Sequence, residues 1–305
     1  MDLGLKGLRA LVTGGTRGIG RAIVETLADE GAAVAFCART AADVARAAGE
    51  MTGRGGVVTG RCVDVSDEAG ARQWVGDTAA DLGGLDIVVA NVSALAIPDE
   101  EANWRASFDV DLMGTVHLVN AALPYLERSE AASIVTISSV SGREVDFAAG
   151  PYGTMKAAII HYTQGLAYQL AAKGIRANSL SPGNTYFPGG VWENIERSNP
   201  ELFAAALGLN PTGRMARPKE IARAAVFLAS PAANFVTGAN LLVDGALTRA
   251  VQFCAGRHSR RRPTRRCRGP APGGRPGSRV RPIPAQWSAL TGQCGAGCFQ
   301  LGQQR

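Results

Sequence analysis

The sequence contains no run of about 18 consecutive apolar residues, the length that a membrane-spanning helix needs. Its first residues, MDLGLKGLRALVTGG, lack a charged segment followed by an apolar segment and a cleavage site. Cysteine is scarce as well, with six in 305 residues, and Cys37 and Cys62 lie inside apolar runs. This usage indicates buried thiols in a reducing compartment and not a disulfide framework. We therefore expect a cytoplasmic protein that neither spans a membrane nor is secreted.

Metal-ligating patterns are also lacking. The three histidines, at positions 117, 161 and 258, have no ligand spacing. Cys294 and Cys298 are separated by three residues, but no second pair accompanies them. We expect no metal site.

Acidic residues are absent from the last part of the chain. Residues 254–305 contain eleven Arg, many Gly and Pro, and no Asp or Glu, so the net charge of +6 comes from this segment. Such a composition cannot bury enough apolar surface to offset the entropy of ordering, which predicts a disordered tail after a single domain of residues 1–253. The tail could be an arm that contacts phosphates, an out-of-frame or read-through extension, or a plain flexible segment. It has few aromatic residues to stack bases, so we do not expect a nucleic-acid partner.

What residues 1–253 do contain is an alternation of two patterns. Short apolar runs typical of strands lie at 9–14, 32–39, 56–65, 85–91, 132–139, 175–182 and 240–245. Helical patterns lie between several of them, for example at 19–31, 104–129 and 155–174. Apolar strands that alternate with helices predict an α/β fold with a doubly wound parallel sheet, the Rossmann arrangement, in which ligands bind at the carboxyl ends of the strands.

A glycine-rich turn, TGGTRGIG, follows the first predicted strand and precedes a helical pattern. Glycines allow a tight turn and a close approach of the backbone to a pyrophosphate, whose charge the first N–H groups of the helix meet. This position favours a dinucleotide site over a simple turn. The candidate cofactor-binding residues in it are Thr13, Gly14, Thr16, Arg17, Gly18, Ile19 and Gly20.

The end of the second predicted strand indicates which dinucleotide binds. An acidic residue there would bond the ribose 2′-hydroxyl, but the sequence has Ala38 followed by Arg39. Arg17 adds a second cation, and two guanidinium groups can hold a 2′-phosphate, so NADP(H) is favoured over NAD(H). The alternative is that Arg39 is a solvated loop residue. Asp64 and Val65, at the end of the third strand, are expected beside the adenine ring.

Ser139, Tyr152 and Lys156 form the third pattern. Tyr152 and Lys156 are four residues apart, so on a helix they share a face and can point to one place. Ser139 lies thirteen residues before Tyr152, at the end of a predicted strand. An exposed Tyr and Lys at a helix start would be the alternative.

Taken together, the glycine-rich turn, Asp64, Ser139, the Tyr152 and Lys156 pair and the SPG triplet at 181–183 resemble the short-chain dehydrogenase/reductase family, including its 3-oxoacyl-acyl-carrier-protein reductases. The resemblance covers about residues 3–253. It implies that Tyr152 exchanges a proton with the substrate oxygen, that Ser139 polarises this oxygen, and that Lys156 favours the phenolate and binds the nicotinamide ribose. It also implies cofactor contacts from Asn91, Pro182 and Gly183, as well as from Tyr152 and Lys156.

Two stretches depart from the family pattern. The family's N-N-A-G stretch reads Ala90-Asn91-Val92-Ser93 here, which keeps one Asn. In FDVDLMG the family usually has Asn where this chain has Asp111, and that Asn supports a water in a proton relay to the lysine. Asp111 could still accept from water or hold the charge of Lys156, and we count it as a candidate catalytic residue. Alternatively, it only pins a bulge in a helix.

Residues 184–215 have apolar side chains among Gly and Pro, as expected of a lid with an irregular start and an amphipathic helix. With Phe147 they predict an apolar pocket without an arginine clamp, unless Arg143 or Arg214 turns inward. We expect an NADP(H)-dependent oxidoreductase for a hydrophobic ketone or secondary alcohol, or a 3-oxoacyl thioester. A non-catalytic dinucleotide-binding module and an NAD-dependent alcohol dehydrogenase are the alternatives. The resemblance also implies a homodimer or homotetramer, with residues 238–247 in an interface.

Overall fold

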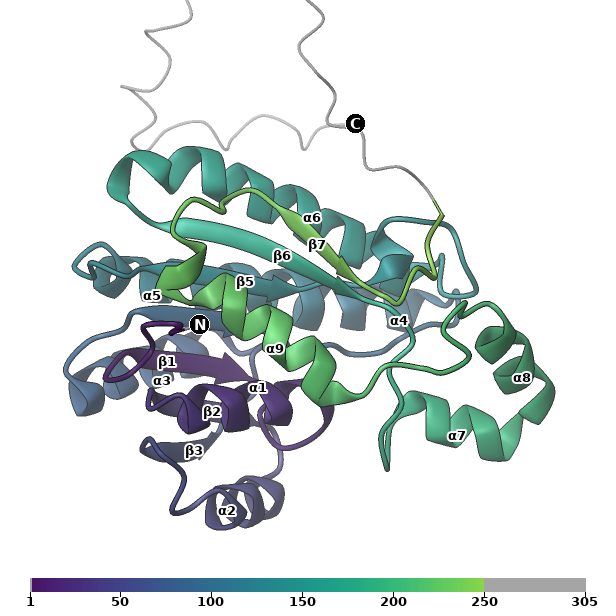
Figure 1. The fold of residues 1–305 in the computed structure, drawn as a ribbon, viewed down its shortest axis with the longest axis horizontal. Coiled ribbons are helices and arrows are strands. Elements are labelled where there is room, and N and C mark those ends of the chain that lie inside the picture. Colours follow the sequence, from purple (N-terminus) through teal and green to yellow (C-terminus); the bar gives the residue numbers. More distant parts are fainter. Residues whose placement is uncertain (1, 250–305) are drawn as a thin grey trace, which may run out of the picture. The chain divides into compact units, whose positions relative to one another are not determined.

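The computed structural model describes residues 2–249, which form a parallel sheet of seven strands with helices on both faces (Figure 1). The predicted α/β doubly wound fold is confirmed. The predicted boundary at 253 and the tail at 254–305 lie outside the described residues and stay predictions. In spatial order the strands are β3 (Val58–Cys62), β2 (Ala33–Ala38), β1 (Arg9–Thr13), β4 (Ile87–Ala90), β5 (Ser133–Ile137), β6 (Arg176–Pro182) and β7 (Asn240–Val243).

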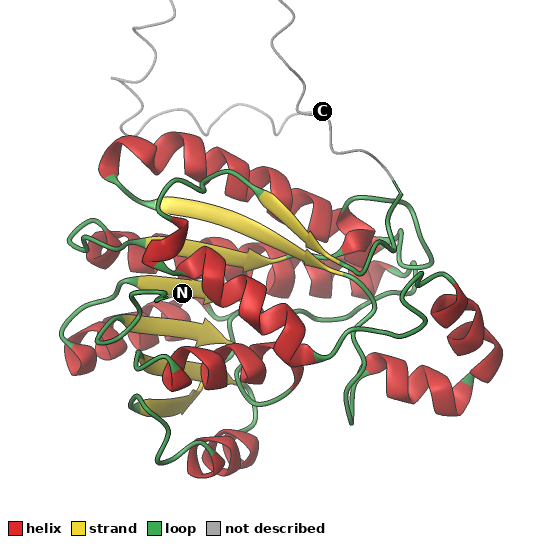
Figure 2. Ribbon diagram, viewed as in Figure 1, coloured by secondary structure: helices red, strands yellow, loops and turns green. Residues whose placement is uncertain are grey.

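Two hydrophobic clusters, one on each face of the sheet, hold the helices in place. Helices α1 (Gly18–Asp29), α2 (Ala41–Glu50) and α9 (Pro218–Ala229) contribute to the first cluster, and α3 (Glu68–Leu82), α5 (Gly114–Leu126) and α6 (Pro151–Leu170) to the second. Figure 2 shows the resulting three layers. Because both faces are covered, the central strands β1, β4 and β5 are almost entirely buried, which explains their unbroken apolar sequences.

Helix α6 sets the position of two predicted site residues. It begins at Pro151, whose ring fixes φ at a helical value. The missing N–H of proline costs no hydrogen bond there, because the first N–H groups of a helix have no acceptor within the helix. Its buried positions include Lys156, Ile159, Thr163 and Leu166, a spacing of three to four residues. After a short 3₁₀ turn over Ala171–Lys173 the chain leaves the helix at Gly174, with φ +74°.

Two details of the fold differ from the sequence prediction. The third strand is only Val58–Cys62, and because β3 is an edge strand its last four residues are exposed. The prediction that Cys62 is a buried thiol is therefore wrong, whereas Cys37 in β2 is buried, and this burial raises its pKa to about 12.

The second difference lies in the helix predicted at 104–129. The structure divides this region into α4 (Glu101–Ala106), a π-helical segment over Ser107–Met113, and α5. A π-helix adds an extra residue per turn and is frequent at functional sites. Asp111 lies within this segment. Among residues 2–249 no helix has both the length and the apolar character needed to cross a bilayer.

Buried Arg176, at the start of β6, stabilises the end of α9 on the sheet. Its guanidinium donates to the backbone oxygens of Leu228, Ala229 and Ser230 at 2.6, 3.0 and 3.0 Å, groups that the helix itself leaves unpaired. Burial of the charge lowers the Arg176 pKa from its ordinary value. We expect Arg176→Met to reduce the free energy of unfolding by about 3 kcal/mol, because buried carbonyl groups lose their donors. Urea unfolding measures this loss.

The matched control for this prediction is Arg223→Met. Arg223 is an exposed residue of the same helix α9, so its replacement should leave the unfolding midpoint nearly unchanged. Equal midpoints for the two variants would contradict the stabilising role of Arg176.

Candidate active site

The order of the strands places a crevice beside β1. Its neighbours are β2 on one side and β4 on the other. Strands β1 to β3 are added toward one edge of the sheet and strands β4 to β7 toward the opposite edge, so the order of the strands reverses beside β1. In open α/β sheets such a switch point is where ligands bind, outside the carboxyl ends of the strands. The segments that leave β1, β4, β5 and β6 all emerge at this edge (Figure 1).

A cleft of about 880 Å³ opens at this edge, a size within the range of ligand sites. Most of the predicted site residues line it: Gly14, Thr16, Arg17, Gly18, Ile19, Gly20, Arg39, Val65, Asn91, Ser139, Tyr152, Lys156, Pro182 and Gly183. The fold thus brings residues that are far apart in the sequence to the same cleft. Thr13, Asp64 and Asp111 are the predicted site residues that do not line the cleft.

The glycine-rich turn requires glycine at particular positions. Gly14 and Gly18 have φ of +72° and +56°, in the left-handed region that favours glycine. A Cβ on Gly20 would lie 2.1 Å from the backbone oxygen of Gly14, so any side chain there would collide with the turn. The tight turn places Gly18, Ile19 and Gly20, the first residues of α1, on the cleft wall, as a pyrophosphate cradle requires.

Thr13 lies beneath the cleft and joins the ends of β1 and β4. Its Oγ1 accepts a hydrogen bond from the backbone N–H of Asn91 at 2.9 Å, and Asn91 Nδ2 donates to the backbone oxygen of Thr13 at 3.0 Å. The one Asn that this chain keeps of the family's N-N-A-G stretch thus fixes the two strand ends. Thr13 therefore supports the cleft and does not line it.

Asp64 does not line the cleft. Its carboxylate accepts from the backbone N–H and the hydroxyl of Ser66, at 3.0 and 2.7 Å. Partial burial acts to raise the pKa of Asp64, but the bonds from Ser66 and the charge of Arg39 outweigh it, so this pKa lies below its ordinary value. Of the two residues predicted beside the adenine ring, only Val65 lines the cleft.

Three arginines line the cleft: Arg17, Arg39 and Arg46. Arg17 Nη1 lies 3.4 Å from the backbone oxygen of Gly189 in the predicted lid. Arg17 and Arg39 were predicted from the sequence, and both are exposed. Arg46 was not predicted from the sequence, because only the packing of α2 against the sheet brings it to the cleft. It is paired with Asp43 at 2.9 Å and with Glu50 at 3.6 Å, so part of its charge is offset.

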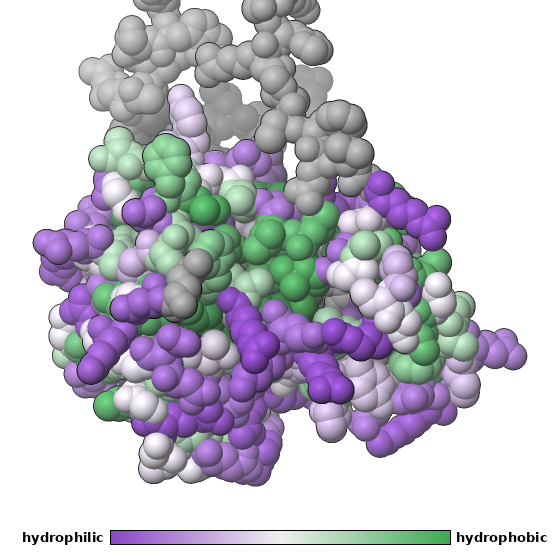
Figure 3. Space-filling view, in the orientation of Figure 1, coloured by the Kyte–Doolittle hydropathy of each residue, from purple (hydrophilic) through white to green (hydrophobic). Residues whose placement is uncertain are grey.

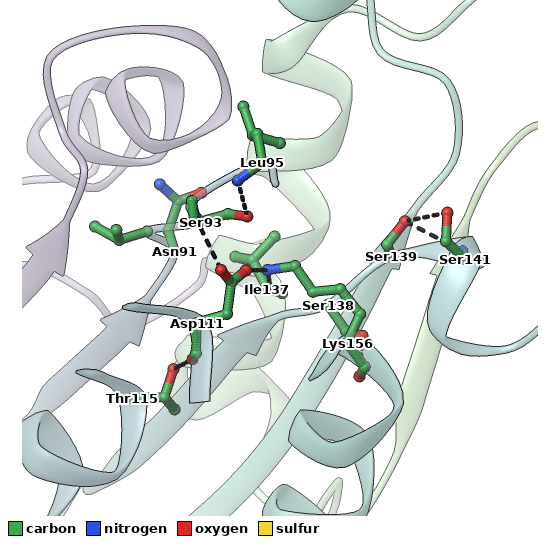
Figure 4. Close-up of polar contacts among 12 residues, drawn as sticks. Asn91, Ser93, Leu95, Asp111, Thr115, Ile137, Ser138, Ser139, Ser141 and Lys156 are labelled. Carbon is green, nitrogen blue, oxygen red and sulfur yellow. Dashed lines mark hydrogen bonds and ion pairs between the residues drawn. The ribbon is translucent and has the colours of Figure 1, made fainter. Parts of the chain in front are cut away.

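Lys156 and Asp111 form a buried ion pair behind the cleft wall (Figure 4). The Lys156 Nζ lies 3.1 Å from Asp111 Oδ1 and donates to the backbone oxygen of Ile137 at 3.2 Å. Lys156 is 2% exposed and Asp111 0%, so neither charge is solvated by bulk water. Oδ1 has this ionic partner but no hydrogen bond of good geometry.

The π-helical segment brings Asp111 to this position. Its Oδ2 accepts from the backbone N–H of Ala94 at 2.9 Å, and its backbone oxygen accepts from Thr115 Oγ1 at 2.7 Å. The carboxylate thus pairs with Lys156 and also ties a bulged helix to the segment after β4. Its catalytic role stays a prediction.

Tyr152 lines the cleft one helical turn before Lys156. The Lys156 Nζ lies 5.6 Å from the centre of the Tyr152 ring, within the range of a cation–π contact. Ser138, which sequence reasoning missed, holds the turn of α6 between them in place through a hydrogen bond to the backbone oxygen of Lys156 at 2.8 Å. Its only sequence signal was its place beside Ser139.

Ser139 is the first member of a short chain of hydrogen bonds. Its Oγ donates to Ser141 Oγ at 3.3 Å, and Ser141 Oγ donates to Asp146 Oδ2 at 2.7 Å. Ser141 and Asp146 both line the cleft, and neither was predicted. Nothing in the spacing of the sequence pairs them, because the loop between β5 and α6 determines their approach.

The far end of the cleft is covered by residues of the predicted lid. Two short helices are present where one was predicted, α7 (Val191–Ser198) and α8 (Pro200–Gly208). Phe147 contacts Trp192 edge to face, with 5.6 Å between ring centres, and both line the cleft. Ile195, Phe203 and Leu207 do not line the cleft, and they pack against Trp192, Ala206 and Met215 in a small cluster behind this wall. Neither Arg143 nor Arg214 lines the cleft, and Arg214 is paired with Glu220.

A family model described as enoyl-(acyl carrier protein) reductase matches residues 14–248. A solved structure of a mutant short-chain dehydrogenase/reductase from Serratia marcescens is 31% identical with a TM-score of 0.74, covering 80% of this chain and 99% of that one. The chain belongs to the short-chain dehydrogenase/reductase family. A structure of the same type from Mycobacterium ulcerans is 29% identical with a TM-score of 0.73, over 79% of this chain and 90% of that one.

Curated relatives of this short-chain dehydrogenase/reductase are also named as dehydrogenases. Isoepoxydon dehydrogenase of Penicillium expansum is 42% identical over 83% of this chain and 99% of the relative. L-fucose dehydrogenase of Mus musculus is 38% identical over 77% of this chain and 86% of the relative. Cis-4-hydroxycyclohexanecarboxylate dehydrogenase of Sinomonas cyclohexanicum is 36% identical over 78% and 96%. The protein is an oxidoreductase of a family that acts on alcohols and ketones with a nicotinamide dinucleotide.

Proposed function

We propose that this chain is an NADP(H)-dependent oxidoreductase that converts a ketone and its secondary alcohol into each other, with Tyr152 as the acid and base. The observation that carries the proposal is the convergence of Ser139, Tyr152 and the ion-paired Lys156 on one cleft. Hydrophobic ketones and 3-oxoacyl thioesters remain the substrate classes predicted from the sequence. The curated relatives, named for L-fucose and for a hydroxycyclohexanecarboxylate, favour a ring alcohol or ketone.

The residues present fit the nicotinamide dinucleotide of the family. The glycine-rich turn and the first residues of α1 line the cleft, where N–H groups at a helix start would meet a ligand's phosphates. Arg17 and Arg39 would hold a 2′-phosphate at the other end, and no acidic residue follows β2 directly. Tyr152, Lys156, Pro182 and Gly183 line the part of the cleft where the nicotinamide and its ribose would lie.

The bound dinucleotide supplies the hydride in reduction and takes it up in oxidation. On binding of substrate, the Ser139 hydroxyl would turn from Ser141 to donate its one hydrogen bond to the substrate oxygen, and so hold it beside Tyr152, where charge develops on it. The Tyr152 hydroxyl gives its proton to this oxygen during reduction, and in oxidation the phenolate takes the proton back. The positive charge of Lys156 favours the negative phenolate. Asp111 fixes Lys156 in place through their buried ion pair at 3.1 Å.

An interface with a second copy of the chain is part of the proposal. Edge strand β7 presents half-buried Leu241, Leu242 and Val243, and Figure 3 shows hydrophobic side chains gathered over this part of the molecule. An apolar edge strand invites pairing with another chain. A homodimer or homotetramer through residues 238–247 remains the proposal. The cytoplasmic location predicted from composition also stays a prediction.

Titration with NADPH and NADH tests the cofactor proposal. We expect NADPH to bind more tightly, and Arg39→Ala to weaken NADPH binding about tenfold or more while NADH binding changes little. Loss of a charge-assisted hydrogen bond to the 2′-phosphate costs at least about 1.5 kcal/mol, which is a factor of about ten. Nicotinamide fluorescence gives both dissociation constants.

The control for this titration is Arg72→Ala. Arg72 is an exposed arginine of α3, paired with Glu68, and does not line the cleft. Its replacement should leave both affinities unchanged. Equal or tighter binding of NADH by the unaltered protein would contradict the proposed 2′-phosphate site and favour an NAD-dependent alcohol dehydrogenase.

A further inference from the structure

Beyond the groups that the proposed chemistry uses, the cleft contains a carboxylate and a hydroxyl. Ser141 and Asp146 both lie on the wall beside Ser139. We propose that they form a hydroxyl-binding arm, and that the preferred substrate is a neutral ketone or secondary alcohol with a further hydroxyl group next to the reacting carbon. This inference rests on the proposed function, because it concerns the substrate of the same cleft.

The geometry places the arm beside the reacting oxygen. Ser139 Oγ, which would hold that oxygen, lies 3.3 Å from Ser141 Oγ, and Ser141 Oγ lies 2.7 Å from Asp146 Oδ2. The arm therefore begins one hydrogen bond away from the group that holds the substrate. A hydroxyl on the carbon next to the carbonyl would project beside this bond. Figure 4 shows Ser139 and Ser141 side by side at the end of the β5 segment.

The arm has acceptor capacity that its internal bonds do not use. Asp146 Oδ1 accepts from the backbone N–H of Ala148 at 2.9 Å, and Oδ2 accepts from Ser141. An ionised carboxylate offers about four acceptor positions, and no other donor to Asp146 is present among residues 2–249. The hydrogen bond from Ala148 is enough to fix the turn before α6, so the bond from Ser141 is not needed for that purpose. A half-buried carboxylate on a cleft wall with positions to spare therefore suits a ligand that donates a hydrogen bond, such as a hydroxyl group.

The charges at this end of the cleft specify a neutral ligand. Arg143 and Arg214 lie off the cleft wall, and the charge of Lys156 is offset by Asp111. The carboxylate of Asp146 is therefore the charge that a substrate meets here. An anionic group beside it would be repelled, because like charges in a partly desolvated site interact strongly. Phe147 and Trp192 provide the apolar wall that the carbon skeleton would contact.

The test compares cyclohexanone with 2-hydroxycyclohexanone as substrates, using NADPH and the full-length protein. We expect the ratio of kcat/KM, hydroxyketone over ketone, to fall about tenfold or more in Asp146→Ala relative to the unaltered protein. Comparing this ratio between proteins cancels the difference in inherent reactivity of the two ketones. It also cancels any general loss of Ser139 function, because both ketones depend on Ser139 equally. Ser141→Ala should lower the ratio in the same direction, and it serves if Asp146→Ala disturbs the loop.

Glu144→Gln is the matched control. Glu144 is an exposed acidic residue of the same loop and does not line the cleft, so its ratio should equal that of the unaltered protein. An anionic probe, 3-oxocyclohexanecarboxylate, should gain about tenfold in kcat/KM relative to cyclohexanone in Asp146→Asn, because the repelling charge is removed.

The outcomes separate this inference from the function on which it rests. Reduction of both ketones with the same ratio in all variants would overturn the hydroxyl-binding arm and leave the oxidoreductase proposal intact. Turnover of neither ketone, together with no difference between the unaltered protein and Tyr152→Phe, would overturn the proposed function and this inference with it.

Discussion

Replacing Tyr152 with phenylalanine should reduce kcat by about 10³-fold or more while the dissociation constant for NADPH changes less than about threefold. The substitution removes only the hydroxyl that exchanges a proton with the substrate oxygen, and general acid and base groups contribute about 10² to 10⁴ in rate. The ring remains on α6, so the cation–π contact with Lys156 at 5.6 Å is kept. Steady-state turnover and nicotinamide fluorescence, measured on the same preparation, give the two numbers.

Tyr168→Phe provides the control for this substitution. Tyr168 lies on the same helix, is 85% exposed and does not line the cleft. Its loss of a hydroxyl should leave kcat unchanged. Unchanged turnover in Tyr152→Phe would exclude Tyr152 as the acid and base. Cofactor binding without turnover in any variant would instead favour a dinucleotide-binding module that does not catalyse.

The parts of this site that the sequence predicts are those set by local rules. The turn at Gly14 and Gly18 follows from the need for a left-handed backbone, and the shared face of Tyr152 and Lys156 follows from helical periodicity. The apolar sequences of the inner strands predict burial on both faces, which the structure confirms. Each of these signals is contained within a few residues of the chain.

Features that depend on how distant segments meet could not be predicted. Arg46 reaches the cleft only because α2 packs beside the end of β2, and Ser141 meets Asp146 only because of the path of one loop. Cys62 belongs to an apolar run, but the third strand lies at the edge of the sheet, so its side chain is exposed. The order of the strands decides this, and no local pattern encodes that order.

The ion pair of Lys156 and Asp111 combines both kinds of information, and it predicts a large effect on stability. Each residue is visible in the sequence, but only the π-helical segment brings the two charges to 3.1 Å. In Asp111→Leu the buried ammonium loses its carboxylate, and we expect the free energy of unfolding to fall by about 3–5 kcal/mol. Lys156→Met should cost a similar amount, because it leaves the carboxylate of Asp111 buried without its cation. Urea unfolding of each variant measures these losses.

The double variant Asp111→Leu with Lys156→Met distinguishes a paired interaction from two independent ones. Removing both charges leaves no unpaired ion in the core, and apolar replacements of buried pairs are often close to neutral. A remaining loss of about 1–3 kcal/mol is expected, since the backbone N–H of Ala94 loses its acceptor. The two single losses should therefore not add. Additive losses would mean that the charges do not depend on each other in the folded protein.

Activity should not return with stability in that double variant, which separates folding from chemistry. The folded double variant would lack the positive charge beside Tyr152, and we expect its kcat to stay at least about 10²-fold below that of the unaltered protein. Asp111→Asn is the informative intermediate, because the amide oxygen can still accept from Ala94 and the lysine is kept. We expect it to retain turnover within about tenfold, since the family usually has Asn at this position. Loss of turnover in Asp111→Asn comparable with Lys156→Met would instead show that this chain requires the carboxylate charge itself.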